Sequence, residues 1–314
     1  MQDKKQSTRL IRAAALAMAL GAVALGVSAQ QGAGGAGGGG APQPFVVHQL
    51  KPNVYWVEGG GGNSAVIVGN NGVIVVDAKV SAAGGAELIA DIAKITPKPV
   101  TTLFLTHSDG DHVNGLASFP KGLTIISQEN CKTEMQAAPS AAAGGPLADY
   151  LPTRTVTRTM ENMTIEGVHL RTFHFAPAHT SGDLMVYLPD DKIMFTGDIV
   201  AAQSPYPLIH LEKHGSSDGW VTTLNGILAT DATTFVPGHG GVQMKADLQK
   251  RLADTLARRD QIKMLVAQGK SLDEVRAAMG EPPPPARAGA GGGGGAFPSF
   301  QDFTGVIYAE QTKK

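Results

Sequence analysis

Two histidines and two aspartates occur within six residues, directly after an apolar, β-branched run at residues 100–105. The run is typical of a buried strand. The four polar residues are His107, Asp109, Asp111 and His112. Buried Asp and His side chains are costly unless they are paired or bound to a metal ion. A loop at the end of a strand can aim four side chains at one point, so this pattern predicts a metal site.

The same short stretch allows a second interpretation. Asp and Asn accept hydrogen bonds from the first backbone N–H groups of a helix. Asp111 or Asn114 could therefore serve as the N-cap of a helix that follows the strand. In that case the four polar residues would form an ordinary polar loop, without a metal.

Three more candidate ligands occur where later strands are expected to end. They are His179 after the strand 170–176, Asp198 after the strand 192–196, and His239 after the strand 233–236. One polar residue at a strand end means little. Four strand-end sites that each offer His or Asp indicate convergence at one edge of a sheet.

With these blocks in order, the chain resembles the metallo-β-lactamase-fold superfamily. That family's pattern is His-x-His-x-Asp-His, then a single His, then Gly-Asp, then Gly-His-Gly. The resemblance covers about residues 45–280 and departs at Asp109, where the family has its second His. The Gly-Asp block at Asp198 is similar to that of glyoxalase II-like hydrolases. The resemblance implies an α/β fold, an αββα four-layer sandwich, with a two-metal site at one edge of the sheets.

The resemblance also implies roles for the candidate ligands. The first metal would take His107, Asp109 and His179, the second would take Asp111, His112 and His239, and Asp198 would bridge the two. Asp111 would in addition act in catalysis by orienting the attacking hydroxide. The cofactors are expected to be two divalent ions. Zinc is the first expectation, and iron or manganese is the alternative because Asp109 adds an oxygen ligand.

Hydrolysis is the chemistry that such a centre supports. We expect a metal-dependent hydrolase that acts on a small-molecule ester, lactone, thioester or lactam. One alternative is a di-iron redox protein, because flavodiiron proteins share the fold and place a Glu at the position of Asp109. Another alternative is a metal-binding protein without catalytic activity.

The N-terminal residues are typical of a secretory signal peptide. A basic region with Lys4, Lys5, Arg9 and Arg12 precedes an apolar stretch and the small residues that end at Ala29. We therefore expect a signal peptide at 1–29, a periplasmic or secreted protein, and no stable membrane association after cleavage. The other expected segments are a Gly-rich linker at 30–44, a catalytic domain at 45–280, a Pro- and Gly-rich loop at 281–299, and a C-terminal helix and tail at 300–314.

The charge balance argues against nucleic acid as a partner. The whole chain has a formal charge of −1, and the first 29 residues contribute +3, which leaves −4 for the remainder. A nucleic-acid-binding surface normally needs a basic patch. The single cysteine, Cys131, cannot form an internal disulfide and lies away from the candidate ligands.

Several connections are expected to surround the site. Gly59–Gly62 predicts either a mobile flap over the metals or a loose turn. The segments 139–152 and 200–215 are expected to form the walls of a cleft, and His210 or His214 in the second segment could contact substrate. Strands at 153–160, 163–165 and 168–175 are expected to begin the second, antiparallel sheet.

Overall fold

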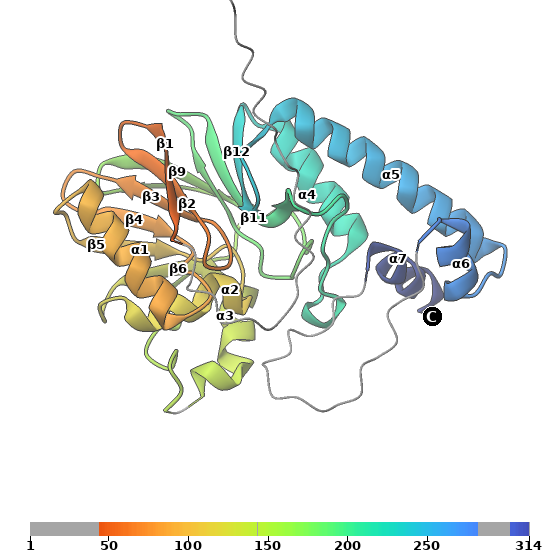
Figure 1. Cartoon of the computed structure of the whole chain (residues 1–314), viewed down its shortest axis with the longest axis horizontal. Coiled ribbons are helices and arrows are strands. Elements are labelled where there is room, and N and C mark those ends of the chain that lie inside the picture. Colours follow the sequence, from red (N-terminus) through yellow and green to blue (C-terminus); the bar gives the residue numbers. More distant parts are fainter. Residues whose placement is uncertain (1–43, 143, 282–301, 314) are drawn as a thin grey trace, which may run out of the picture. The chain divides into compact units, whose positions relative to one another are not determined.

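A computed structural model describes residues 44–142, 144–281 and 302–313 (Figure 1). The expected signal peptide, almost all of the Gly-rich linker and almost all of the Pro- and Gly-rich loop lie outside these residues. Within the described residues, no helix is both long and apolar enough to cross a membrane.

The first sheet has seven strands in chain order. They are β1 (Val46–Lys51), β2 (Val54–Glu58), β3 (Ser64–Val68), β4 (Val73–Val76), β5 (Val100–Phe104), β6 (Thr124–Gln128) and β7 (Arg154–Val156). β1 to β4 pair antiparallel, and β4 to β7 pair parallel. The expectation that a strand at 153–160 begins the second sheet is wrong. Residues 154–156 form β7, which pairs with β6 in the first sheet.

The second sheet has six strands, in the order β13-β12-β11-β10-β9-β8. They are β8 (Met160–Ile165), β9 (Val168–Phe173), β10 (Met185–Leu188), β11 (Ile193–Ala201), β12 (Thr234–His239) and β13 (Gln243–Met244). All neighbours pair antiparallel except β11 and β12, which pair parallel. β11 runs past the expected end at residue 196, with irregular register on both sides of Gly197.

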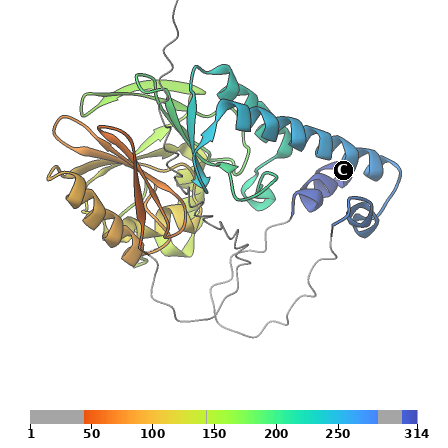
Figure 2. The same ribbon diagram turned by 45° about the horizontal axis from the view of Figure 1, so that its top comes forward.

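Helices cover the outer face of each sheet. They are α1 (Ala82–Ile95), α2 (Gly110–Val113), α3 (Glu129–Ala137), α4 (Ser217–Ala229), α5 (Lys245–Ala267), α6 (Leu272–Ala278) and α7 (Phe303–Thr312), with 3-10 turns η1 (Asn114–Ser118), η2 (Pro139–Ala141) and η3 (Leu211–Lys213). Ser81 caps α1, and Ser271 with Glu274 forms a capping box at the start of α6. Figures 1 and 2 both show α7 beside α5.

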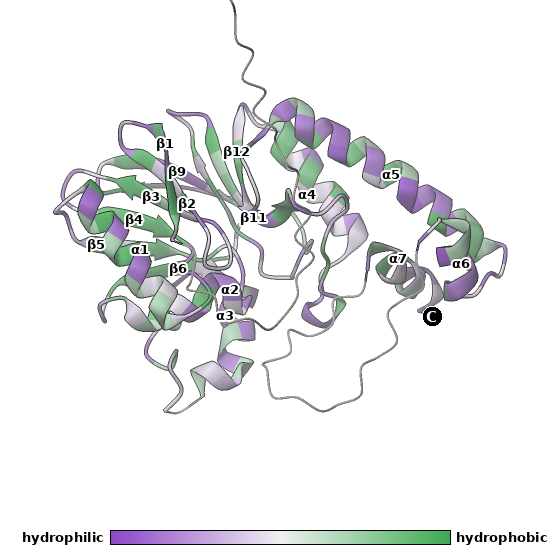
Figure 3. Ribbon diagram, viewed as in Figure 1, coloured by the Kyte–Doolittle hydropathy of each residue, from purple (hydrophilic) through white to green (hydrophobic). Residues whose placement is uncertain are grey.

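Three apolar cores hold the layers together and confirm the expected αββα sandwich. The core between the sheets contains Trp56, Ile67, Ile74 and Phe104 from the first sheet and Leu170, Val186, Phe195 and Val236 from the second. A second core packs α1 and α3 on the first sheet, and a third packs α4, α5 and α7 on the second. Figure 3 shows the resulting pattern, with hydrophobic strands inside and alternating hydrophilic and hydrophobic residues along α5.

Candidate metal centre

The seven candidate ligands come from five places in the fold, and the structure brings them together. His107 and Asp109 lie between β5 and α2, Asp111 and His112 lie on α2, His179 lies between β9 and β10, Asp198 lies within β11, and His239 ends β12. Their ligand atoms form three overlapping groups in which every pair of atoms lies within 4.8 Å. The groups are His107, Asp109 and His179; Asp111, His112 and His239; and His107, His112 and Asp198.

Asp198 lies between the other two groups. Its Oδ1 is 3.3 Å from His112 Nε2, and its Oδ2 is 3.4 Å from His239 Nε2 and 3.9 Å from His179 Nε2. A carboxylate in this position can contact two ions at once. Gly238 makes the position available, because a Cβ on residue 238 would lie 1.8 Å from Asp198 Oδ1. The Gly before His239 is thus required by close approach to Asp198.

The site contains polar atoms that are buried without a hydrogen bond. Among the described residues these include Nε2 of His107, Nε2 of His112 and Oδ1 of Asp198. An unsatisfied buried polar group costs about 1–3 kcal/mol, and the three residues that carry these atoms form one of the close groups. Divalent cations bound at the centre would satisfy all three atoms, so the residues fit a metal centre.

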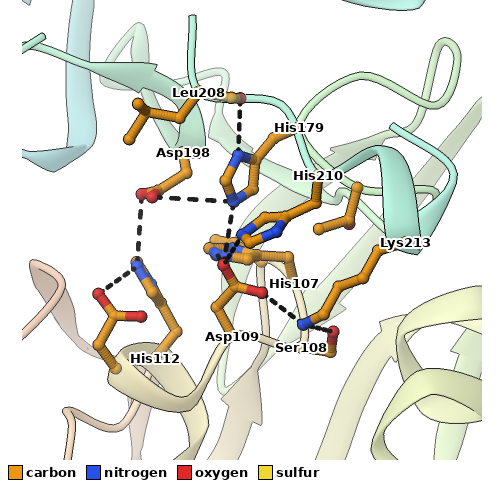
Figure 4. A network of polar contacts seen from close by, with 12 residues as sticks. His107, Ser108, Asp109, His112, His179, Asp198, Leu208, His210 and Lys213 are labelled. Carbon is orange, nitrogen blue, oxygen red and sulfur yellow. Dashed lines mark hydrogen bonds and ion pairs between the residues drawn. The ribbon is translucent and has the colours of Figure 1, made fainter. Parts of the chain in front are cut away.

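The alternative of a plain helix cap is wrong. α2 begins after Asp109, which makes no side-chain capping hydrogen bond, and neither Asp111 nor Asn114 is the N-cap. The carboxylate of Asp109 instead faces the histidines. Figure 4 shows His107, His179 and His210 grouped around it, with Lys213 on its other side.

At Asp109 and Asp198, attraction to the neighbouring histidines lowers the carboxyl pKa by more than burial raises it. Burial by itself would raise the pKa of Asp109, but His107, His179 and His210 hold that pKa well below its usual range. Burial opposes the charge of Asp198 in the same way, and His112 and His239 hold the pKa of this carboxyl well below its usual range. Both aspartates are therefore ionised and available as anionic ligands.

Outer partners orient the histidine rings. Asp77 Oδ2 lies 2.7 Å from His112 Nδ1 and accepts a 2.7 Å hydrogen bond from the hydroxyl of Thr106. That hydroxyl lies 2.9 Å from His107 Nδ1. Because the Nδ1 atoms are engaged, the Nε2 atoms of both rings face the centre. Asp77 was not among the residues expected at the site, although an Asp directly after the buried strand β4 was a usable signal.

Two residues of the loop after β11 also reach the site. His210 Nε2 lies 2.8 Å from Asp109 Oδ2, and Lys213 Nζ lies 2.5 Å from Asp109 Oδ1. His210 was expected only as a substrate contact, and Lys213 was not singled out. His214, the other expected candidate in this loop, is exposed and caps η3 in the left-handed region with φ of 58°. No periodicity distinguishes these residues in the sequence.

A cleft of about 420 Å³ opens beside the centre. Its ionisable lining residues are Asp109, Asp111, Asp198, His210, Lys213 and His239. Part of its wall comes from the loop after β11 and the end of that strand, with Ala201, Gln203, Ser204 and Leu208. The loop after β11 thus forms a wall, as expected. The segment 139–152 is absent from the described lining residues, because its Leu147 and Tyr150 pack into the core on the first sheet.

Of the glycines at 59–62, Gly61 lies against Asp111 and Gly62 lies against His112. A Cβ on Gly62 would lie 2.2 Å from the His112 ring, and Gly62 N donates to the carbonyl of Asp111 at 3.1 Å. The buried amine of Lys79 donates to the Gly62 carbonyl at 3.0 Å and to the Val57 carbonyl at 2.7 Å. These contacts anchor the segment at its Gly62 end.

The sequence of this chain matches the family model of the metallo-beta-lactamase superfamily over residues 57–239. This chain belongs to that superfamily. The match spans every candidate ligand and the strands of both sheets that carry them, which agrees with the fold and with the ligand blocks.

Individual relatives are distant. The lactamase-like protein notP of Aspergillus sp. is 24% identical over 65% of this chain and 57% of its own length, and the linear primary-alkylsulfatase of Pseudomonas sp. is 23% identical over 67% and 48%. The chain thus spans about half the length of these curated relatives. The solved structure of the inverting sec-alkylsulfatase Pisa1 from Pseudomonas sp. superposes with a TM-score of 0.62 at 15% identity, over 76% of this chain and 46% of that one. Other matches are named as metallo-beta-lactamases and a carboxyl ACP thioesterase.

The superfamily relatives support a metal-dependent hydrolase in general terms. The His and Asp groups of this chain suggest that it binds divalent metal.

Proposed function

We propose that this protein is an exported hydrolase that uses two divalent ions to activate water against a small ester, thioester, lactone or lactam. The observation that carries the proposal is the convergence of seven His and Asp side chains beside one cleft. When bound at such groups, divalent ions supply Lewis acidity that activates water and polarises the bond to be cleaved. Zinc is the first candidate, with iron or manganese as the alternative.

Different residues of this chain would hold the two ions. His107, Asp109 and His179 would hold one ion, Asp111, His112 and His239 would hold the other, and Asp198 would contact both. Each histidine would present Nε2, and the buried position of the group would keep bulk water from competing with the ligands.

Asp111 lies in the position of a residue that interacts with the proton of the attacking water. Its side chain is 20% exposed, lines the cleft and has Oδ2 at 3.0 Å from His239 Nε2. Burial would raise its pKa, but the hydrogen bond from His239 and the charges of His112 and His107 lower it. As an ionised carboxylate, Asp111 can accept a hydrogen bond from the attacking water and orient it towards substrate.

The test begins with the purified mature protein. Metal content should be measured first, and activity should then be measured on a panel of an aryl ester, a lactone, a thioester, a cephalosporin and an alkyl sulfate. Chelation should abolish hydrolysis, and readdition of metal should restore it. Asp111→Asn should lower kcat strongly, whereas His214→Asn at the exposed loop position should not. Full activity in metal-free protein would exclude the mechanism.

The export part of the proposal rests on the order of basic, apolar and small residues at 1–29. Expression of the full chain in a bacterial host should yield periplasmic protein that begins at Gln30, as measured by mass spectrometry. Recovery only from the cytosol with Met1 retained would contradict export without affecting the hydrolase proposal.

A further inference from the structure

Three imidazole nitrogens face one oxygen of Asp109. His210 Nε2 lies 2.8 Å from Oδ2, His179 Nε2 lies 3.2 Å from it, and His107 Nε2 lies 3.6 Å from it. Two ligands that each lie about 2.0–2.1 Å from a shared ion are about 2.9–3.4 Å apart at the usual coordination angles. The distance from His179 lies within this range, and the distances from His210 and His107 lie within about 0.2 Å of it, so the three nitrogens surround this oxygen at spacings close to those of ligands of one ion.

His210 is oriented in the same way as the other two rings. In each of the three, an oxygen lies beside Nδ1, which leaves Nε2 towards Asp109, as is usual for histidines that bind metal. The oxygens belong to Glu212 for His210, to the carbonyl of Leu208 for His179 at 2.8 Å, and to the Thr106 hydroxyl for His107 at 2.9 Å. The carboxylate of Glu212 gives His210 the strongest acceptor of the three.

His210 is buried, unlike an ordinary histidine in a surface loop. Only 3% of His210 is exposed, whereas His214, four residues later in the same loop, is exposed. Lys213 holds the other oxygen of Asp109 at 2.5 Å and contacts Ser108 Oγ at 2.9 Å. The contact between Lys213 and Oδ1 fixes the carboxylate of Asp109, so that its Oδ2 remains directed at the three imidazole rings.

We propose that His210 is a ligand of the first metal position, together with His107, Asp109 and His179. The imidazole that the family pattern has at position 109 is then supplied by the loop after β11. This inference rests on the metal centre of the proposed function. With Asp198 as a bridging ligand, the position has five protein donors, which exceeds the four of tetrahedral zinc and favours iron or manganese.

A second role for His210 must be distinguished from ligation. A hydrogen bond from His210 to Asp109 would orient that carboxylate without any contact to metal. Glutamine separates the two roles, because its amide can still donate a hydrogen bond to Asp109 but is a poor metal ligand.

The experiment uses the mature protein with Co(II) in place of the native metal. In proton NMR, each imidazole bound to Co(II) gives a strongly shifted, exchangeable Nδ1–H signal. His210→Gln should show one such signal fewer than wild type, and His214→Asn, the matched control from the same loop, should show none fewer. Competition with a chromophoric chelator should show at least about a 100-fold rise in the dissociation constant of the first metal.

Glu212→Gln provides a variant that leaves His210 in place. The Glu212 side chain is 57% exposed, so its replacement should not prevent folding. We expect metal affinity at the first position to fall about 10-fold, because His210 loses its carboxylate partner.

The outcomes separate this inference from the proposed function. Two metals in wild type, with an unchanged signal count in His210→Gln, would overturn the ligand assignment and leave the metal centre intact. A wild-type protein that binds no divalent metal would overturn both.

Discussion

Asp77 Oδ2 lies 2.7 Å from Nδ1 of His112, and both side chains are buried. Asp77 also accepts hydrogen bonds from the backbone N–H of Thr106 at 2.8 Å and from its hydroxyl at 2.7 Å. One carboxylate at the end of β4 thus connects the loop after β5 to a candidate ligand on α2. The residue has φ of 61°, a conformation that Asp and Asn tolerate better than most residues.

Asp77→Asn should keep the local shape and remove the carboxylate. Without the charge-assisted partner, His112 becomes a weaker ligand, so the dissociation constant of the second metal should rise about 10–100-fold. Chelator competition measures this change. Asp190→Asn is a suitable control, because Asp190 contacts His169 at 2.9 Å on the exposed surface. Equal affinity in the Asp77 and Asp190 variants would show that Asp77 does not act through His112.

Gly62→Ala should displace the ring of His112. A Cβ at position 62 would lie 2.2 Å from Cε1 of that ring, whereas a Cβ at Gly241 would meet nothing within 4 Å. We expect Gly62→Ala to lose metal from the second position and most hydrolytic activity, while Gly241→Ala keeps both. Metal analysis after dialysis and circular dichroism would separate this effect from misfolding. A Gly62→Ala protein that retains all its metal would contradict the close packing.

Lys79 should make stability depend on pH in the alkaline range. Its amine is fully buried, and burial lowers its pKa to about 7 against the opposing charge of Asp77, Asp91, Glu58 and Glu87. Between about pH 7 and 10.5 the unfolded chain binds more protons at this residue than the folded one, so its contribution to the free energy of unfolding rises with pH.

The comparison with Lys79→Met isolates this contribution. The difference in unfolding free energy, wild type minus variant, should rise by at most about 1.4 kcal/mol per pH unit between pH 7 and 10.5 and stay flat below that range. Urea denaturation at equal metal loading measures it. A difference that is constant across the alkaline range would show that the amine stays charged when folded.

Metal removal should lower stability as well as activity. The buried, unsatisfied atoms of His107, His112 and Asp198 gain partners only when a cation is bound. An ion present at 100 times its dissociation constant adds about 2.7 kcal/mol to the free energy of unfolding. The melting temperature should therefore fall on chelation and recover on readdition. Asp198→Asn should reduce this difference, and an identical melting temperature with and without metal would argue against the centre.

The sequence by itself determined the class of fold and the identity of the candidate ligands. The apolar, β-branched run at 100–105 located β5, and the helix expected within 300–314 is α7, which Asp302 caps. These signals are local, because a strand's burial and a helix cap depend on neighbouring residues. The His and Asp blocks could be recognised as a site because burying these side chains is costly in free energy unless they share a binding partner.

The tertiary structure alone decided which segments meet. β7 joined the first sheet because its backbone pairs with β6, a choice that local hydrophobicity does not encode. His210 and Asp109 are 101 residues apart in the chain and touch only because the loop after β11 returns to the end of β5. Periodicity reports that a residue is buried, but a contact between distant residues depends on how the layers stack, and only the folded chain shows that.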